Sequence, residues 1–334
     1  MSQGILATIG HTPLVRLNKI FPANPFRLFA KLEGFNPGGS IKDRPAISII
    51  ERGMLVGEIN SGTTIIESSS GNMGIGLAQI CAYYGLRFIC VADAKTTKQN
   101  MRLLKTYKAE VEVIEKPDAE TGEYLPARIK RVRELCKLIG NSFWPNQYAN
   151  KNNAAAHYQT MQEIITESGG RVDYLFCAVS TFGTLRGCVE YLRQEKLTTT
   201  VYAVDAVGSV IFGSRKAKRL IPGHGAAVVP ALFGGDLADR AIHVSDLDCV
   251  VGCRRLVNTE AILAGGSSGA VLMAVKQVSD QIPDGATCVM IFPDRGERYL
   301  DTIYEDDWVY QNFGDVSHLW EIPSTAYEAV TVNV

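Results

Sequence analysis

The sequence predicts an α/β protein of two domains, each with a mostly parallel sheet flanked by helices. Short apolar runs alternate with helical segments along most of the chain. The 334 residues are 46% hydrophobic and 21% charged, a composition that suits a large buried core. Because the alternating units are too many for one compact sheet, we expect them to be divided between two domains.

The predicted elements follow one another in a regular order. Strands are expected over TTIIES (63–68), RFICVAD (87–93), EVEVIE (110–115), VDYLFCAV (172–179), TVYAVDA (200–206) and CVMIFPD (288–294). Helices are expected over GIGLAQICAYYG (74–85), TKQNMRLLKTYKA (97–109) and LRGCVEYLRQ (185–194). Short buried strands that alternate with helices indicate parallel sheets covered on both faces. The segment WPNQYANKNN (144–153) interrupts the pattern, so we expect a domain boundary near residues 145–155.

Composition and charge exclude several classes of function. The net charge of −1 and the pI of about 6.5 indicate no nucleic-acid surface, and the basic run RIKRVRELCK (128–137) is interpreted as one solvated helix face. No signal peptide or membrane-spanning run is visible. Eight cysteines lie mostly in apolar segments without zinc-ligand spacing, so we expect reduced core residues in a cytoplasmic protein and no metal site.

The stretch NPGGSIKDRPA (36–46) contains a lysine in an unusual place. Ser40 and Asp43 have the spacing of a capping pair at the start of a helix, and Lys42 lies between them. A cation beside Arg44 at a helix N-terminus is disfavoured, so we expect the pKa of the Lys42 amine to fall. A neutral amine suits a Schiff base with pyridoxal phosphate, and a solvated surface lysine is the alternative.

Three predicted strand-to-helix loops carry groups suited to a ligand. The loops ESSSGNMG (67–74) and STFGT (180–184) place hydroxyl and N–H groups at helix N-termini, which suits a carboxylate or phosphate. They lack the GxxxxGK[ST] and GxGxxG patterns of nucleotide sites. The loop AGGSSGAV (264–271) allows close backbone approach to a flat group. Ordinary helix caps and tight packing are the alternatives.

Taken together, the motifs resemble those of fold-type II pyridoxal-phosphate enzymes, and the chain is similar to the cysteine synthase and cystathionine β-synthase group. The motifs are NPGGSIKDR, ESSSGNMGIGLA, STFGTLRG, AGGSSGA and PDRGERYLDT, which span most of residues 5–305. The resemblance implies a tryptophan synthase β-like fold, a homodimer and pyridoxal 5′-phosphate as cofactor. It also implies a smaller mobile domain over 38–148, a larger cofactor-binding domain over 5–37 and 149–310, and an irregular tail over 311–334.

The resemblance implies a role for each matching residue. Lys42 matches the Schiff-base lysine that also moves the substrate α-proton, Asn72 the residue that hydrogen-bonds the ring hydroxyl, and Ser267 the serine that faces the pyridine nitrogen. The implied phosphate loop is Ser180, Thr181, Phe182, Gly183 and Thr184. The implied carboxylate-binding groups are Ser69, Ser70, Asn72, Met73 and Gln147. A neutral serine at the pyridine nitrogen favours β-elimination, so a two-step β-replacement is implied.

Departures from cysteine synthase indicate a particular branch. Met73 replaces the usual threonine and offers only its backbone N–H group, and Ser180 replaces the usual glycine. Tyr148 and Arg128 are interpreted as further substrate-selecting groups. These features resemble the N-(2-amino-2-carboxyethyl)-L-glutamate synthases of the staphyloferrin B siderophore pathway. That branch joins O-phospho-L-serine to L-glutamate, releases phosphate and supplies a precursor of L-2,3-diaminopropionate.

Other interpretations remain open from the sequence. A cysteine synthase would use O-acetylserine or O-phosphoserine with sulfide. A catalytically silent relative would act as a binding or regulatory partner, although Lys42, Asn72 and Ser267 argue against it. His224 stands where a small or apolar residue is usual, and we expect it to face solvent, with a substrate contact as the alternative.

Overall fold

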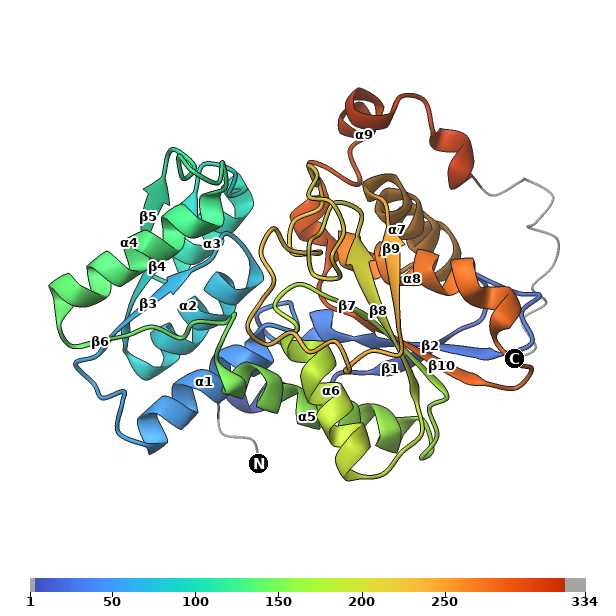
Figure 1. Cartoon of the computed structure of the whole chain (residues 1–334), viewed down its shortest axis with the longest axis horizontal. Coiled ribbons are helices and arrows are strands. Elements are labelled where there is room, and N and C mark those ends of the chain that lie inside the picture. The colour runs from blue at the N-terminus through green and yellow to red at the C-terminus, as the bar shows by residue number, and fades with distance from the viewer. Residues whose placement is uncertain (1–3, 322–334) are drawn as a thin grey trace.

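The structure, a computed structural model that describes residues 4–321, contains two separate sheets (Figure 1). The larger sheet consists of β1 (Leu14–Leu17), β2 (Arg27–Leu32), β10 (Thr287–Phe292), β7 (Tyr174–Ala178), β8 (Thr200–Ala206) and β9 (Arg240–Val244), in that spatial order. The smaller sheet consists of β5 (Glu110–Ile114), β4 (Arg87–Asp93), β3 (Thr64–Ser68) and β6 (Ser142–Phe143). Only β1 and β2 pair in antiparallel fashion, so the predicted α/β class with mostly parallel sheets is confirmed.

Helices cover both sheets, as parallel strands require. They are α1 (Asp43–Leu55), α2 (Asn72–Tyr84), α3 (Lys98–Thr106), α4 (Tyr124–Ile139), α5 (Lys151–Glu167), α6 (Gly183–Gln194), α7 (Asp246–Glu260), α8 (Gly266–Val278) and α9 (Asp306–Phe313). The smaller sheet lies between α4 on one face and α1 with α2 on the other. Helix α1 also packs against α5 of the larger domain, so it lies at the junction between the two sheets (Figure 1).

The sequence pattern located the six strands and three helices that it predicted, whereas β1, β2, β6 and β9 and helices such as α5 and α7 were not predicted. All six expected strands are present, and the three expected helices correspond to α2, α3 and α6. The tail expected to be irregular from residue 311 begins with the last residues of α9 and includes a 3-10 turn at Ser317–Leu319. Phe313, Val316 and Trp320 pack against the core of the larger domain, which explains the order there. Residues 322–334 lie outside the described part of the chain.

The predicted burial of the cysteines is confirmed. All eight have free thiols, and seven of them are buried; Cys136 is half-buried. Within residues 4–321, no helix is both long enough and apolar enough to span a lipid bilayer.

A buried ionic cluster fixes α1 to the larger domain. Nε and Nη2 of Arg44 donate to the two carboxylate oxygens of Glu33 at 2.7 and 2.8 Å, and the same guanidinium donates to Glu163 of α5 at 2.7 and 2.9 Å. Lys31 Nζ lies 3.0 Å from Glu163. The side chains of Arg44 and Glu33 are 3% and 0% exposed. Such complete pairing offsets the cost of removing these charges from water.

We predict that Arg44→Ala destabilises the protein strongly, because it leaves Glu33 as a buried carboxylate without its main partner. The free energy of unfolding should fall by about 3–5 kcal/mol. Arg87→Ala is the matched control, since the Arg87–Glu110 ion pair is half exposed and should contribute less than about 1 kcal/mol. Urea denaturation of both variants measures the difference, and equal losses would contradict the prediction.

Candidate active site

Lys42 lies directly before α1 and is half-buried. Burial lowers the pKa of its amine because it disfavours the charged form, while Cys177 and Asp294 nearby act in the opposite direction. The expected direction of the shift is therefore confirmed, but its cause is different. We expected the helix N-terminus and Arg44 to disfavour the cation, whereas burial dominates and the charge of Arg44 is balanced by its own carboxylates.

The expected capping pair at the start of α1 does not form. The Asp43 carboxylate accepts a hydrogen bond from the backbone N–H of Gly38, and the Ser40 hydroxyl accepts one from the N–H of Lys42 at 3.2 Å. These bonds fold the loop before α1 back on itself and fix the backbone on either side of Lys42. Burial raises the pKa of the Asp43 carboxyl to about 7.

The first ligand loop, between β3 and α2, is held by its own hydroxyl groups and by Gln147. Ser69 Oγ accepts from the N–H of Gly74 at 2.9 Å, so this side chain caps α2. Gln147 Nε2 donates to the carbonyl of Ser68 at 3.2 Å, which places Gln147 beside the loop as the resemblance implied. Met73 is buried in the core, so only its backbone is available to a ligand. Ser70 and Asn72 are half-buried.

The second loop, between β7 and α6, presents a helix N-terminus. Phe182 has a left-handed backbone (φ 69°), which turns the chain so that α6 begins at Gly183. A Cβ atom at Gly183 would lie 2.2 Å from Asn153 Oδ1, so only glycine fits there. Thr181 Oγ1 accepts from Asn153 Nδ2 at 3.2 Å, and Thr184 Oγ1 lies 3.3 Å from His157 Nε2. Ser180 is half-buried at the start of this loop.

Asp294 joins the third loop to the first. Its carboxylate accepts from Asn72 Nδ2 and from the Tyr299 hydroxyl, both at 2.7 Å, and its backbone carbonyl accepts from the N–H of Gly265 at 3.1 Å. Ser267 therefore lies two residues from this junction, buried in the first turn of α8. Arg298 contacts Asn72 Oδ1 and the carbonyl of Gly38.

The structure thus links the first and third loops through Asp294, a residue that also affects Lys42. Cys177 precedes the second loop on β7, Asp294 joins the first and third loops, and both affect the charge of the Lys42 amine. Asp294 and Arg298 have no role predicted from the sequence, although both lie in the motif PDRGERYLDT. The arrangement combines an amine whose pKa is lowered by burial, a helix N-terminus suited to a phosphate and a neutral hydroxyl group.

Comparison with known proteins agrees with this arrangement. Residues 5–294 match the model of the pyridoxal-phosphate dependent enzyme family. The chain belongs to this family. It is 34% identical to a cysteine synthase from Entamoeba histolytica, covering 91% of each chain (TM-score 0.85), and 33% identical to a hydrogen sulfide-producing enzyme from Fusobacterium nucleatum, covering 90% of this chain and 100% of that one (TM-score 0.84). It is 30% identical to an O-ureido-L-serine synthase, covering 92% and 98% (TM-score 0.84).

The chain is therefore a pyridoxal-phosphate-dependent β-replacement enzyme of the cysteine synthase family, and the residues present fit that cofactor. The neutral form of Lys42 can form a Schiff base, and the N-terminus of α6 can hold a phosphate. Within the described part of the chain, Asp294 Oδ1, on a carboxylate that affects the Lys42 amine, and Ser268 Oγ, next to Ser267, are buried without a hydrogen-bond partner, as expected where a polar ligand completes a site. When bound, pyridoxal phosphate withdraws electrons from the substrate α-carbon.

Arg128 and Tyr148, expected to select substrates, lie on the smaller-domain side of the site. Arg128 of α4 is 8% exposed, and its Nε lies 3.3 Å from Asp93 Oδ2. Within the described residues, this Nε is buried without a hydrogen-bond partner, and no hydrogen bond of the guanidinium to a protein group is formed. Burial raises the pKa of the Tyr148 hydroxyl, and the charge of Arg128 acts in the opposite direction.

Glu67 organises this side of the site and was not anticipated from the sequence. Its carboxylate accepts from Trp144 Nε1 and from the backbone N–H of Gln147, both at 3.2 Å. Burial raises its pKa to about 7. Because Gln147 precedes Tyr148, this buried carboxylate fixes the segment that carries both predicted substrate groups.

His224 does not face solvent, contrary to expectation. The residue is 1% exposed, and neither ring nitrogen has a hydrogen-bond partner within the described residues. The loop around it is pulled inward, because Gly225 N–H donates to the carbonyl of Val179 at 2.8 Å and Arg219 Nη1 donates to the carbonyl of His224 at 2.9 Å. Burial, with a smaller effect of Arg219, lowers the pKa of His224 to about 3.

We predict that His224 makes the protein less stable in mild acid. The unfolded chain binds a proton near pH 6.5 and the folded chain only near pH 3, so folding stability is lost as the pH falls below 6.5. Between pH 7.5 and pH 5, wild type should lose about 2 kcal/mol more unfolding free energy than His224→Leu. Urea denaturation at both pH values tests this, and parallel losses in the two proteins would contradict it.

Proposed function

We propose that the enzyme joins O-phospho-L-serine to L-glutamate and releases phosphate. The observation that supports this proposal most is the buried guanidinium of Arg128, which lies 3.3 Å from Asp93 and donates no hydrogen bond to a protein group within the described residues; Tyr148 adds a hydroxyl group on the same side of the site. A dianionic leaving group and a dicarboxylate nucleophile need such cations and hydroxyl groups, whereas sulfide does not. Ser180, in place of glycine, adds a hydroxyl group at the phosphate loop.

The proposed reaction assigns a task to each part of the site. The loop from Ser69 to Met73, with Gln147, holds the carboxylate of O-phospho-L-serine. Lys42 takes the α-proton, the bond between the β-carbon and the phosphate oxygen breaks, and phosphate leaves. The amine of L-glutamate then forms a bond to the β-carbon and loses a proton, and Lys42 returns a proton to the α-carbon. The product is N-(2-amino-2-carboxyethyl)-L-glutamate, a precursor of L-2,3-diaminopropionate for siderophore biosynthesis.

We also propose a homodimer in the cytoplasm. Phe35 is 68% exposed, and together with Leu263 it lines a groove of about 350 Å³ on the larger domain. Exposed apolar side chains around a groove suit contact with a second copy of the chain. The buried free thiols suit a reducing compartment.

The first experiment separates the proposed reaction from that of a cysteine synthase, which the likeness to the Entamoeba enzyme favours as second candidate. O-phospho-L-serine is added to the holoenzyme, and the cofactor absorbance and phosphate release are followed. L-glutamate or sulfide is then added in separate samples. We expect phosphate release and a new amino acid with L-glutamate. Product formation with sulfide alone would identify a cysteine synthase and contradict the proposal.

A second prediction concerns Arg128. Replacing it by Ala should lower kcat/KM for O-phospho-L-serine or L-glutamate by roughly ten- to hundredfold, because a hydrogen bond to a charged group contributes about 1.5–3 kcal/mol. Arg131→Ala is the control, since Arg131 lies in the same helix but pairs with Glu112 and Glu134 at the surface. Unchanged kinetics for both substrates in Arg128→Ala would exclude a substrate-selecting role for Arg128.

A further inference from the structure

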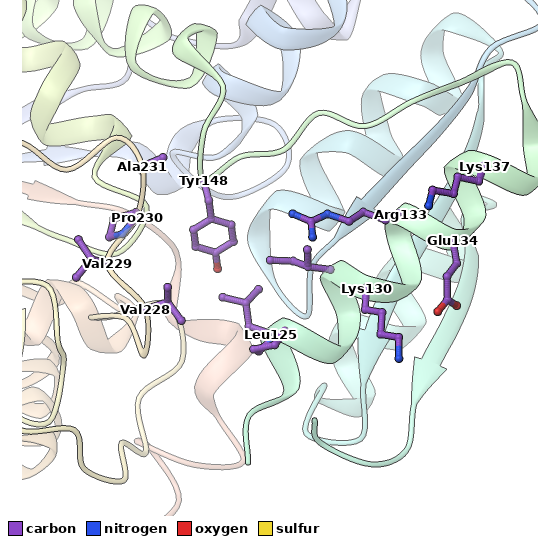
Figure 2. A pocket seen from close by; sticks show the side chains of 12 residues that line it. Leu125, Lys130, Arg133, Glu134, Lys137, Tyr148, Val228, Val229, Pro230 and Ala231 are labelled. Carbon is purple, nitrogen blue, oxygen red and sulfur yellow. The ribbon is translucent and has the colours of Figure 1, made fainter. Parts of the chain in front are cut away.

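A cleft of about 550 Å³ lies between the two domains beside the candidate active site (Figure 2). One wall is α4 and the other is the segment from Val228 to Ala231 of the larger domain; the α4 residues that line it are Leu125, Pro126, Ile129, Lys130, Arg133, Glu134 and Lys137. Figure 2 shows Tyr148 between the two walls, with its hydroxyl directed toward Leu125 and Val228. The cleft therefore connects the protein surface to the segment that carries Gln147.

The cleft is connected to the reaction site in two places, at Tyr148 and at the wall from Val228 to Ala231. Tyr148 follows Gln147, whose backbone and side chain are bonded to Glu67 and Ser68 of the carboxylate loop. The opposite wall follows Gly225, which is bonded to Val179 directly before the phosphate loop. A molecule bound in the cleft is therefore held beside the residues that bind the first substrate.

The charges in the cleft favour an acidic ligand. Lys130 and Arg133 are exposed, lie one turn apart on α4, and form no ion pair within the described residues. Arg133 extends from α4 toward Tyr148 (Figure 2). Glu134, the one carboxylate in the lining, is bonded to Arg131 Nη1 at 3.1 Å and is thus already compensated. The opposite wall contributes only Val, Pro and Ala side chains.

We propose that this cleft is the subsite of the nucleophile, an amino dicarboxylate, and that Lys130 and Arg133 hold its side-chain carboxylate. This assignment rests on the proposed function. The apolar wall suits the methylene groups between the two carboxylates, while the cations on α4 suit the terminal carboxylate. Since the loop from Ser69 to Met73 holds the carboxylate of the first substrate, the cleft remains open to the second. O-phospho-L-serine shares the anionic chemistry, so the test must separate the two substrates.

The test compares two double variants of the holoenzyme. Lys130→Gln/Arg133→Gln removes the charges from the cleft but keeps polar side chains, and Arg102→Gln/Lys105→Gln removes the same charge from α3, which does not line the cleft. We expect the first variant to raise KM for L-glutamate about five- to tenfold at low salt, with kcat nearly unchanged, and the effect to shrink at high salt. Phosphate release from O-phospho-L-serine alone and KM for L-glutamine should stay as in wild type. The α3 variant should match wild type throughout.

Each outcome decides the proposal. An unchanged KM for L-glutamate would overturn the nucleophile subsite. An equal rise in KM for O-phospho-L-serine and for L-glutamate would overturn it as well. If wild type forms no product with L-glutamate, the proposed function fails and the subsite with it; if wild type uses L-glutamate and the variant does so equally well, only the subsite fails. Because Arg133 also stacks over Trp144 at 5.8 Å, Lys130→Gln alone serves as a variant that leaves this packing intact, and it should show a smaller rise of the same kind.

Discussion

The buried guanidinium of Arg44 is the interaction on which the rest of the site depends. Lys42 lies two residues before Arg44. The position of its backbone therefore depends on how firmly Arg44 is held. Glu33 and Glu163 bind the guanidinium from two different parts of the larger domain. This pairing neutralises a cation beside Lys42 and leaves burial as the dominant influence on the amine. An amine whose pKa is lowered by burial and a firmly paired arginine are thus parts of one arrangement.

Around this anchor, the site is assembled from the starts of three helices. Helices α2, α6 and α8 each follow a loop at the end of a parallel strand or beside one, and each loop is fixed by a contact distant in sequence. Asn153 fixes the second loop, and Asp294 fixes the first and third. Backbone N–H groups at helix starts attract phosphate and carboxylate without any ionisable group. These helix starts can therefore attract anions through amide and hydroxyl groups, in addition to the cation of Arg298 that contacts Asn72 and Gly38.

The sequence alone was sufficient for six of the ten strands of the described chain and for the position of the three loops before α2, α6 and α8, because these depend on local patterns. Strand and helix periods are set by neighbouring residues, and the loops from Ser69 and Ser180 are recognisable by their short motifs. The ionic cluster was not predictable in this way, since Arg44 and Glu163 are separated by 119 residues. The burial of His224 was mispredicted for the same reason. Its loop is drawn inward by a backbone hydrogen bond from Gly225 to Val179, and no side-chain pattern reports such a bond.

The buried carboxylate of Glu67 and the exposed cations of α4 lie at different depths, which suggests how one fold can accept different nucleophiles. The buried carboxylate of Glu67 fixes Gln147 on the side of the first substrate, and the exposed cations of α4 lie one layer further out. Substitutions on α4 can change the charge of the cleft without moving Lys42 or the phosphate loop, because they touch neither the ionic cluster nor the helix starts. The outer wall adds to Arg128, Tyr148 and Ser180, under the proposed function, the charge that a nucleophile larger and more acidic than sulfide needs. Under the proposed function, the inner site would determine the chemistry of the β-carbon, and the cleft would determine which amine reaches it.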